Sequence, residues 1–162
     1  SLKAPVRAIA HSGVKLATVS QNTMQNLIVN DAVSQALAKR GATVVVSDID
    51  TEGANKVAEG ILRDGGKAQA AHLDVTSDEE IRKLIEQTAG EHGRLDYMFN
   101  NAGIAIQGEV RDMEKEHWDR IININLLGAL HGTVAAYKLM VEQGFGHIVN
   151  TASVAAGRHK PG

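Results

Sequence analysis

The sequence contains no cysteine and few aromatic residues, which make up 3% of the chain. Without cysteine it can form neither a disulfide framework nor a thiolate metal site. The seven histidines are scattered without the spacing of metal ligands, so we expect no metal centre. A core with so few aromatic side chains has to be built from Val, Ile, Leu and Ala. Such a core suits a parallel sheet that is covered by helices on both faces.

A strong charge imbalance and long apolar runs are also missing. The net charge is -2, and no basic stripe with interleaved aromatic residues occurs, so we expect no nucleic-acid partner. No apolar run reaches the ~18 residues that a membrane span requires, and we expect no membrane partner. The N-terminus lacks the charged and apolar regions of a signal peptide. These absences favour a cytoplasmic protein.

Strand-like and helix-like segments alternate along most of the chain. The strand-like runs are 14–19, 43–47, 67–73, 95–99 and 147–151, and the helical patterns are 31–40, 52–63, 77–92 and 113–142. A capping box at Ser77 and Glu80, in which each side chain binds the other residue's amide, marks one helix start. Strict alternation predicts parallel strands joined by right-handed crossovers. We therefore predict one α/β domain over 1–162, a doubly wound, Rossmann-like parallel sheet truncated after about five strands.

Two aspartates follow predicted strands, where ligands bind in this architecture. Asp48 follows the second strand, and its carboxylate can accept hydrogen bonds from both adenosine ribose hydroxyls and would repel a 2′-phosphate. Asp74 and Val75 follow the third strand, where the carboxylate can pair with the adenine amino group and the Val75 amide can meet a ring nitrogen. The alternatives are a loop or helix-capping role for Asp48 and a turn role for Asp74.

Three further features lie near strand ends or inside a helix. The tetrapeptide Asn100-Asn101-Ala102-Gly103 follows the fourth strand, where its amides can tie neighbouring strands together and its small residues can admit a ligand. A plain turn is the alternative. Asn125 interrupts an apolar helical run, as a local kink satisfied by water or as part of a proton relay. Ser153 follows the fifth strand, as a group that binds a substrate carbonyl or as an exposed loop serine.

The order and spacing of these fragments resemble the short-chain dehydrogenase/reductase family over roughly residues 31–157. The strongest matches are the tetrapeptide at 100–103, the stretch 118–128 that contains Asn125, and the strand 148–153. The resemblance implies a Rossmann-type sheet, a nicotinamide cofactor, and NAD(P)-dependent oxidoreduction of alcohol or carbonyl substrates.

The resemblance also implies a role for each candidate residue. Asp48 selects NAD over NADP, and Asp74 with Val75 holds adenine. The tetrapeptide Asn100, Asn101, Ala102 and Gly103 lines the ribose side of the cofactor. Asn125 is the relay asparagine, and Ser153 orients the substrate.

The first departure from the family concerns glycine. The family has a Thr-Gly-x-x-x-Gly-x-Gly turn after the first strand, whose glycines let the backbone approach the pyrophosphate. This chain has no glycine between Gly13 and Gly41. The glycine positions fall on Met24, Ile28 and Asn30 when counted back from Ala32, and on Gln21, Gln25 and Leu27 when counted forward from the first strand. We therefore predict that the pyrophosphate site is lost and that 1–30 is an atypical segment joined to a family body at 31–157.

The second departure concerns the proton donor, a tyrosine in a Tyr-x-x-x-Lys motif that follows the serine in the family. No such motif occurs here, because Tyr137 is adjacent to Lys138 and Tyr97 precedes the tetrapeptide. We predict a truncated or degenerate short-chain dehydrogenase that is inactive as this chain alone and binds an adenosine-containing ligand. The exposed strand edge at 147–151 predicts a homo-oligomer. Two alternatives stay open: part of an NAD-dependent oxidoreductase completed by another segment or subunit, and a non-catalytic oligomerising module.

Overall fold

A computed structural model of the chain describes residues 15–20, 24–106 and 108–152. Its five strands form one parallel sheet in the order β3-β2-β1-β4-β5. The strands are β1 (Lys15–Ser20), β2 (Thr43–Asp48), β3 (Lys67–His72), β4 (Tyr97–Asn100) and β5 (His147–Asn150). The strand order reverses beside β1, as in a doubly wound sheet. The predicted fold class and all five predicted strands are confirmed.

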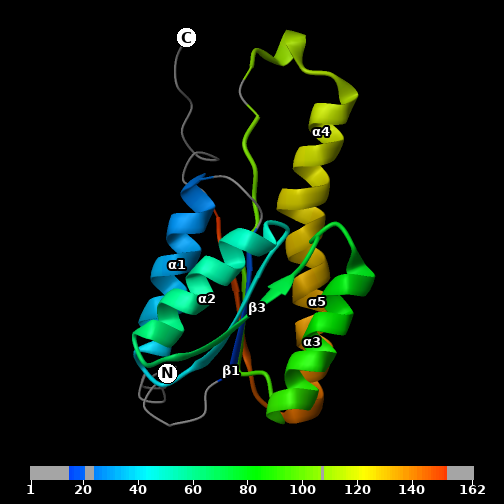
Figure 1. Cartoon of the computed structure of the whole chain (residues 1–162). Coiled ribbons are helices and arrows are strands. Elements are labelled where there is room, and N and C mark those ends of the chain that lie inside the picture. The colour runs from blue at the N-terminus through cyan, green and yellow to red at the C-terminus, as the bar shows by residue number, and fades with distance from the viewer. Residues whose placement is uncertain (1–14, 21–23, 107, 153–162) are drawn as a thin grey trace, which may run out of the picture.

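Helices cover both faces of the sheet. They are α1 (Met24–Ala38), α2 (Thr51–Arg63), α3 (Asp78–His92), α4 (Lys115–Ile121) and α5 (Ala129–Gln143), with the 3₁₀ turn η1 (Val110–Asp112) and the π-helical segment η2 (Ile122–Gly128). Figure 1 shows α1 and α2 on one face, and α3 with α5 on the other. Figure 1 also shows that the connection from β4 rises beyond the sheet before it returns into α4.

The side chains of β2 show how one sheet separates two apolar cores. Val44 and Val46 are buried towards α1 and α2, whereas Val45 between them is buried towards α3 and α5. Successive side chains of a strand point to opposite faces, so a run of three valines contributes to both cores. This explains why the strand is uniformly apolar, as is typical of a parallel sheet covered on both faces.

The start and end of α3 follow sequence signals, with one correction. The Glu80 amide donates to Ser77 Oγ at 3.2 Å, and the helix ends at Gly93, whose φ of 75° lies in the left-handed region. The second half of the predicted capping box is wrong. The Ser77 amide donates to the Asp74 carbonyl, and the Glu80 carboxylate instead accepts from the Asp74 amide at 3.0 Å.

The first helix is longer than the sequence pattern indicates. We expected helix only from about residue 31, whereas α1 begins at Met24. Residues 21–23 connect β1 to α1 and lie outside the described residues. Gln21, one of the predicted glycine positions, is among them. The N-terminus of α1 therefore follows the carboxyl end of β1 after a short connection, at the strand beside which the sheet order reverses.

The segments α4, η2 and α5 form one continuous helix over Lys115–Gln143, called the long helix below. Within the described part of the chain, it is the helix that by length and composition could cross a membrane, which the sequence analysis did not anticipate. Of the most apolar 18 consecutive residues of this helix, 33% are buried inside the structure. Its α5 part packs on β4, β5 and α3, and this packing accounts for the buried part of its apolar composition.

Two glycine-to-alanine substitutions test this packing. A Cβ at Gly128 would lie 2.8 Å from Val75 Cγ2, whereas a Cβ at Gly90 in α3 would meet nothing within 4 Å. We expect Gly128→Ala to lower the free energy of unfolding by about 1–3 kcal/mol, because the helix must move away from Val75. Gly90→Ala should raise it by about 0.5–1 kcal/mol, because alanine favours the helix. Urea unfolding of both variants measures this, and equal stabilities would contradict the described packing.

Candidate functional site

The carboxyl ends of all five strands lie at one edge of the sheet. The strand register places Asp48 opposite Ser20, and Asn100 opposite Asn150. Asp74 follows β3 by two residues, next to the end of β2, because the Leu73 amide donates to the Asp48 carbonyl at 3.0 Å. The edge thus brings together most of the residues that the sequence singled out. Ser153 lies outside the described residues.

Asp48 is buried at the end of β2, with 3% of its surface exposed. Its Oδ1 accepts a hydrogen bond from the Asp50 amide at 2.8 Å. Asp50 caps α2 through the Gly53 amide, so the alternative of a helix cap at Asp48 is wrong. The segment 47–54 contains three acidic residues and no lysine or arginine. This concentration of negative charge is unfavourable for a bound anion.

Asp74 is held in a turn. Its Oδ1 accepts from the Thr76 amide at 2.9 Å and from the Thr76 hydroxyl at 2.8 Å, which confirms the predicted turn role. Val75 is 1% exposed and packs into the core beside Gly128. Because its side chain is enclosed, Val75 can meet a ligand only through its backbone.

The tetrapeptide at 100–103 begins with two buried amides. Asn100 is 5% exposed and Asn101 is 7% exposed. The Asn100 Nδ2 donates to Thr133 Oγ1 of α5 at 3.2 Å and to Asn150 Oδ1 of β5 at 2.7 Å. The predicted tie between neighbouring strands is therefore confirmed for Asn100. Its side chain joins the sheet to the long helix. Residues 101–106 follow β4 without a turn or bend, so the alternative of a plain turn is wrong. We call residues 101–103 the edge segment.

Asn125 lies in the π-helical segment η2 and holds the chain that follows the tetrapeptide. Its Oδ1 accepts from the Ile104 amide at 2.8 Å, and its Nδ2 donates to the Ile104 carbonyl at 2.9 Å. The sequence suggested a kink satisfied by water, whereas the structure has a π segment whose asparagine is satisfied by backbone groups. Asn125 is exposed rather than buried.

Sequence reasoning missed Gln143, which makes the same pair of bonds at the opposite end of β4. Its Oε1 accepts from the Leu95 amide at 2.8 Å, and its Nε2 donates to the Leu95 carbonyl at 2.9 Å. Thr133 and Asn150 were missed as well. Each lies far along the chain from its partner, so no local spacing signals the contact. For Gln143 and Thr133 the sequence offers one signal, a polar side chain in an otherwise apolar helix. That signal was considered only for Asn125.

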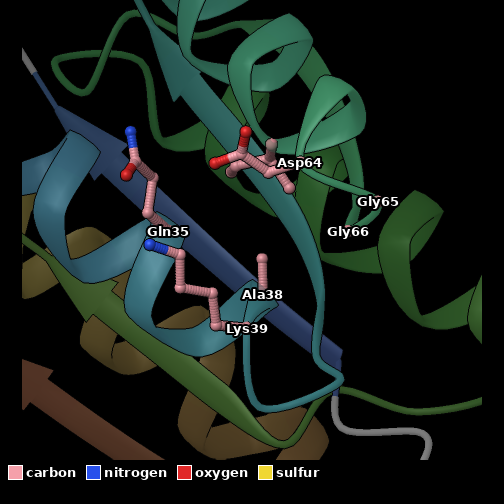
Figure 2. Close-up of a pocket in the computed structure, with 7 residues that line it drawn as sticks. Gln35, Ala38, Lys39, Asp64, Gly65 and Gly66 are labelled. Carbon is pink, nitrogen blue, oxygen red and sulfur yellow. The ribbon is translucent and has the colours of Figure 1, made fainter.

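A cavity of about 220 Å³ lies at the opposite edge of the sheet, where α1 and α2 end and β2 and β3 begin. Figure 2 shows its polar side chains, Gln35 and Lys39 of α1 and Asp64 after α2. In sheets of this type, ligands bind at the carboxyl ends of the strands. The candidate site is therefore the edge that holds Asp48 and Asn100, and this cavity is not part of it.

Replacing Asn125 tests whether its amide holds the chain at Ile104. We expect Asn125→Ala to lower the free energy of unfolding by about 1 kcal/mol, because two backbone groups of Ile104 lose their partner. Backbone amide exchange at 102–106 should accelerate. The matched control is Asn123→Ala in the same segment, which should leave exchange at 102–106 unchanged. Equal exchange in both variants would contradict the described role of Asn125.

Comparisons with known proteins agree with this architecture. A model of the short-chain dehydrogenase family matches residues 30–162. An uncharacterised oxidoreductase of Methylorubrum extorquens is 40% identical over 124 residues, which cover 76% of this chain and 49% of that protein. A crystal structure of a short-chain type dehydrogenase/reductase from Mycobacterium marinum has a TM-score of 0.86 at 31% identity, and the match covers 94% of this chain and 60% of that one.

A structure of NAD⁺-bound xylitol dehydrogenase is also similar, with a TM-score of 0.80 and 29% identity over 93% of this chain and 56% of that chain. This chain spans about half the length of the curated relative described above. The family match begins at residue 30, close to the predicted start of the family body at 31. The family model matches residues 30–162, and the sheet is a five-stranded doubly wound one. The chain therefore belongs to the short-chain dehydrogenase family.

Proposed function

We propose that this chain binds NAD at the carboxyl edge of its sheet, as the dinucleotide-binding part of an oxidoreductase that acts on alcohol or carbonyl substrates. The observation that carries the proposal is Asp48, a buried carboxylate at the end of β2 within an acidic segment. A carboxylate accepts hydrogen bonds from ribose hydroxyls and repels a 2′-phosphate, so NAD is preferred over NADP. The NAD⁺-bound structure similar to this chain supports the choice of cofactor class.

In this proposal, the other residues at the edge contact different parts of the cofactor. The Asp74 turn and the backbone of Val75 hold adenine, and Asn101, Ala102 and Gly103 line the ribose side. Asn100 belongs to the same site through its backbone. The pyrophosphate lies near the N-terminus of α1, where helix dipoles favour anions, but the absence of glycine from 14–40 weakens its binding. Affinity then rests mainly on the adenosine and ribose contacts.

Hydride transfer needs more than these 162 residues in this proposal. When bound, the nicotinamide supplies the hydride chemistry, Asn125 acts in the proton relay, and Ser153 orients the substrate. Neither Tyr97 nor Tyr137 is followed by a lysine four residues later, so the family's proton donor has no counterpart in the sequence. The chain alone is therefore expected to bind nucleotide without turnover.

Replacing Asp48 tests the proposed cofactor preference. We expect Asp48→Asn to shift the ratio of NADH to NADPH affinity by about tenfold towards NADPH, because a charge-assisted acceptor becomes neutral. The asparagine still offers an acceptor to the Asp50 amide. Titration with each nucleotide, followed by nicotinamide fluorescence, measures the ratio.

The control for this experiment is Glu59→Gln, which neutralises an exposed carboxylate of α2. It should leave both affinities unchanged. The proposal fails if the unmodified chain binds neither nucleotide, or if Asp48→Asn and Glu59→Gln give the same ratio.

We further propose that the chain associates with a second copy of itself through the exposed side of the long helix. Six large apolar side chains recur along this side and are 43–62% exposed: Ile122, Leu126, Leu130, Val134, Tyr137 and Val141. A contiguous apolar stripe of this kind is typical of an interaction surface. β5, the outermost described strand on that side of the sheet, lies next to α5 and offers an unpaired edge.

Two leucine-to-glutamate variants test this association. Leu126 on the stripe is 62% exposed, and Leu62 on α2 is 52% exposed. We expect Leu126→Glu to shift the sedimentation of the chain towards the monomer, because the charge would be buried at the interface. Leu62→Glu should leave the sedimentation unchanged. A wild-type chain that sediments as a monomer at all concentrations would contradict the proposal.

A further inference from the structure

Three polar side chains from separate elements meet where the edge segment at 101–103 begins. The Asn100 Nδ2 donates both to Asn150 Oδ1 at 2.7 Å and to Thr133 Oγ1 at 3.2 Å. The Thr133 hydroxyl in turn donates to Asn150 Oδ1 at 3.3 Å. We call this set the Asn100–Thr133–Asn150 clasp. It joins the ends of β4 and β5 to the middle of the long helix.

The backbone around the clasp leaves room for it and extends it. A Cβ at Gly132 would lie 2.1 Å from Asn100 Oδ1, so a glycine is needed for α5 to approach this amide. The Thr151 amide donates to the Asn100 carbonyl at 3.0 Å, which continues the pairing one residue beyond β5. Two residues later in the sequence comes Ser153. The clasp thus fixes the point at which the chain leaves each of the two strands.

The helix that carries Thr133 also carries Asn125. Asn125 holds Ile104 immediately after the tetrapeptide, while Thr133 holds Asn100 at its start. The edge segment at 101–103 is therefore held at both ends from one rigid element. A segment held in this way is pre-organised, and a ligand that binds it loses less free energy to ordering.

We infer that the Asn100–Thr133–Asn150 clasp positions the edge segment at 101–103 for the ribose on the nicotinamide side of the dinucleotide, which AMP lacks. Thr133 and Asn150 are positioning residues, and the Asn100 side chain acts through the backbone rather than by touching the ligand. This inference rests on the proposed function. The competing interpretation is that the clasp only holds the sheet together, in which case its loss would lower stability without a selective effect on the ligand.

The test replaces Thr133 by valine, which keeps the shape and removes the hydroxyl, and by serine, which keeps the hydroxyl. The matched control is Thr88→Val, because the buried Thr88 hydroxyl donates to the Leu84 carbonyl at 2.7 Å within α3, away from the edge segment. Dissociation constants for NADH and for AMP are measured at a temperature at which all variants are folded. AMP carries adenosine and its 5′-phosphate but lacks the nicotinamide half of NADH. It therefore reports on the adenosine contacts at Asp48 and Asp74.

We expect Thr133→Val to weaken NADH binding by about five- to tenfold and to leave AMP binding unchanged. Thr133→Ser should restore the NADH affinity. Thr88→Val should lower the melting temperature without changing either affinity. The inference is overturned if Thr133→Val weakens NADH and AMP equally, or if it changes neither affinity.

Backbone amide exchange separates failure of this inference from failure of the proposed function. In Thr133→Val, exchange should accelerate at 101–104 and at Thr151, whereas Thr88→Val should leave these amides unchanged. If the unmodified chain binds neither nucleotide, the proposed function fails and the inferred effect on the ligand fails with it. The exchange data then still decide whether the clasp holds the edge segment. A uniform acceleration along the chain would overturn that part as well.

Discussion

Backbone amides and carbonyls need hydrogen-bond partners where a strand leaves its sheet, and this structure depends on that requirement. For β4, the long helix supplies the partners. Gln143 pairs with both backbone groups of Leu95 before the strand, and Asn125 pairs with both backbone groups of Ile104 after it. Thr133 lies between them and binds Asn100. One apolar helix therefore fixes the position of β4 through three polar side chains.

The same constraint shapes the rest of the edge. Asp48 and Asp74 each bind a backbone amide two residues ahead, so both carboxylates are already oriented without a ligand. A carboxylate oriented in this way gains affinity because less freedom is lost on binding. Structural and ligand-binding roles for these residues are therefore compatible. In a parallel sheet, the residues that leave the carboxyl ends of the strands need stabilising contacts. They lie at the same edge as the site that binds ligand.

The sequence predicted the parts of the fold that depend on local patterns. The valine run of β2 and the cap at Ser77 are readable because strands and helix starts have short-range signatures. The contacts of Gln143 and Thr133 were not readable, since each depends on a partner more than thirty residues away. Asn125 was singled out because an asparagine is unfavourable inside a helix, but the sequence does not reveal that Ile104 satisfies it. Residues 24–30 of α1, about two turns, were missed because the polar segment 20–26 gave no helix signal.

The central claim is that the carboxyl edge of the sheet is a pre-formed dinucleotide site anchored at Asp48. A crystal structure of the chain grown with NAD tests it most directly. The claim predicts density for the adenosine ribose against the Asp48 carboxylate, with residues 101–104 in the same conformation as without ligand. Density for the nucleotide elsewhere, for example between the ends of α1 and α2, or a changed conformation of residues 101–104, would contradict it.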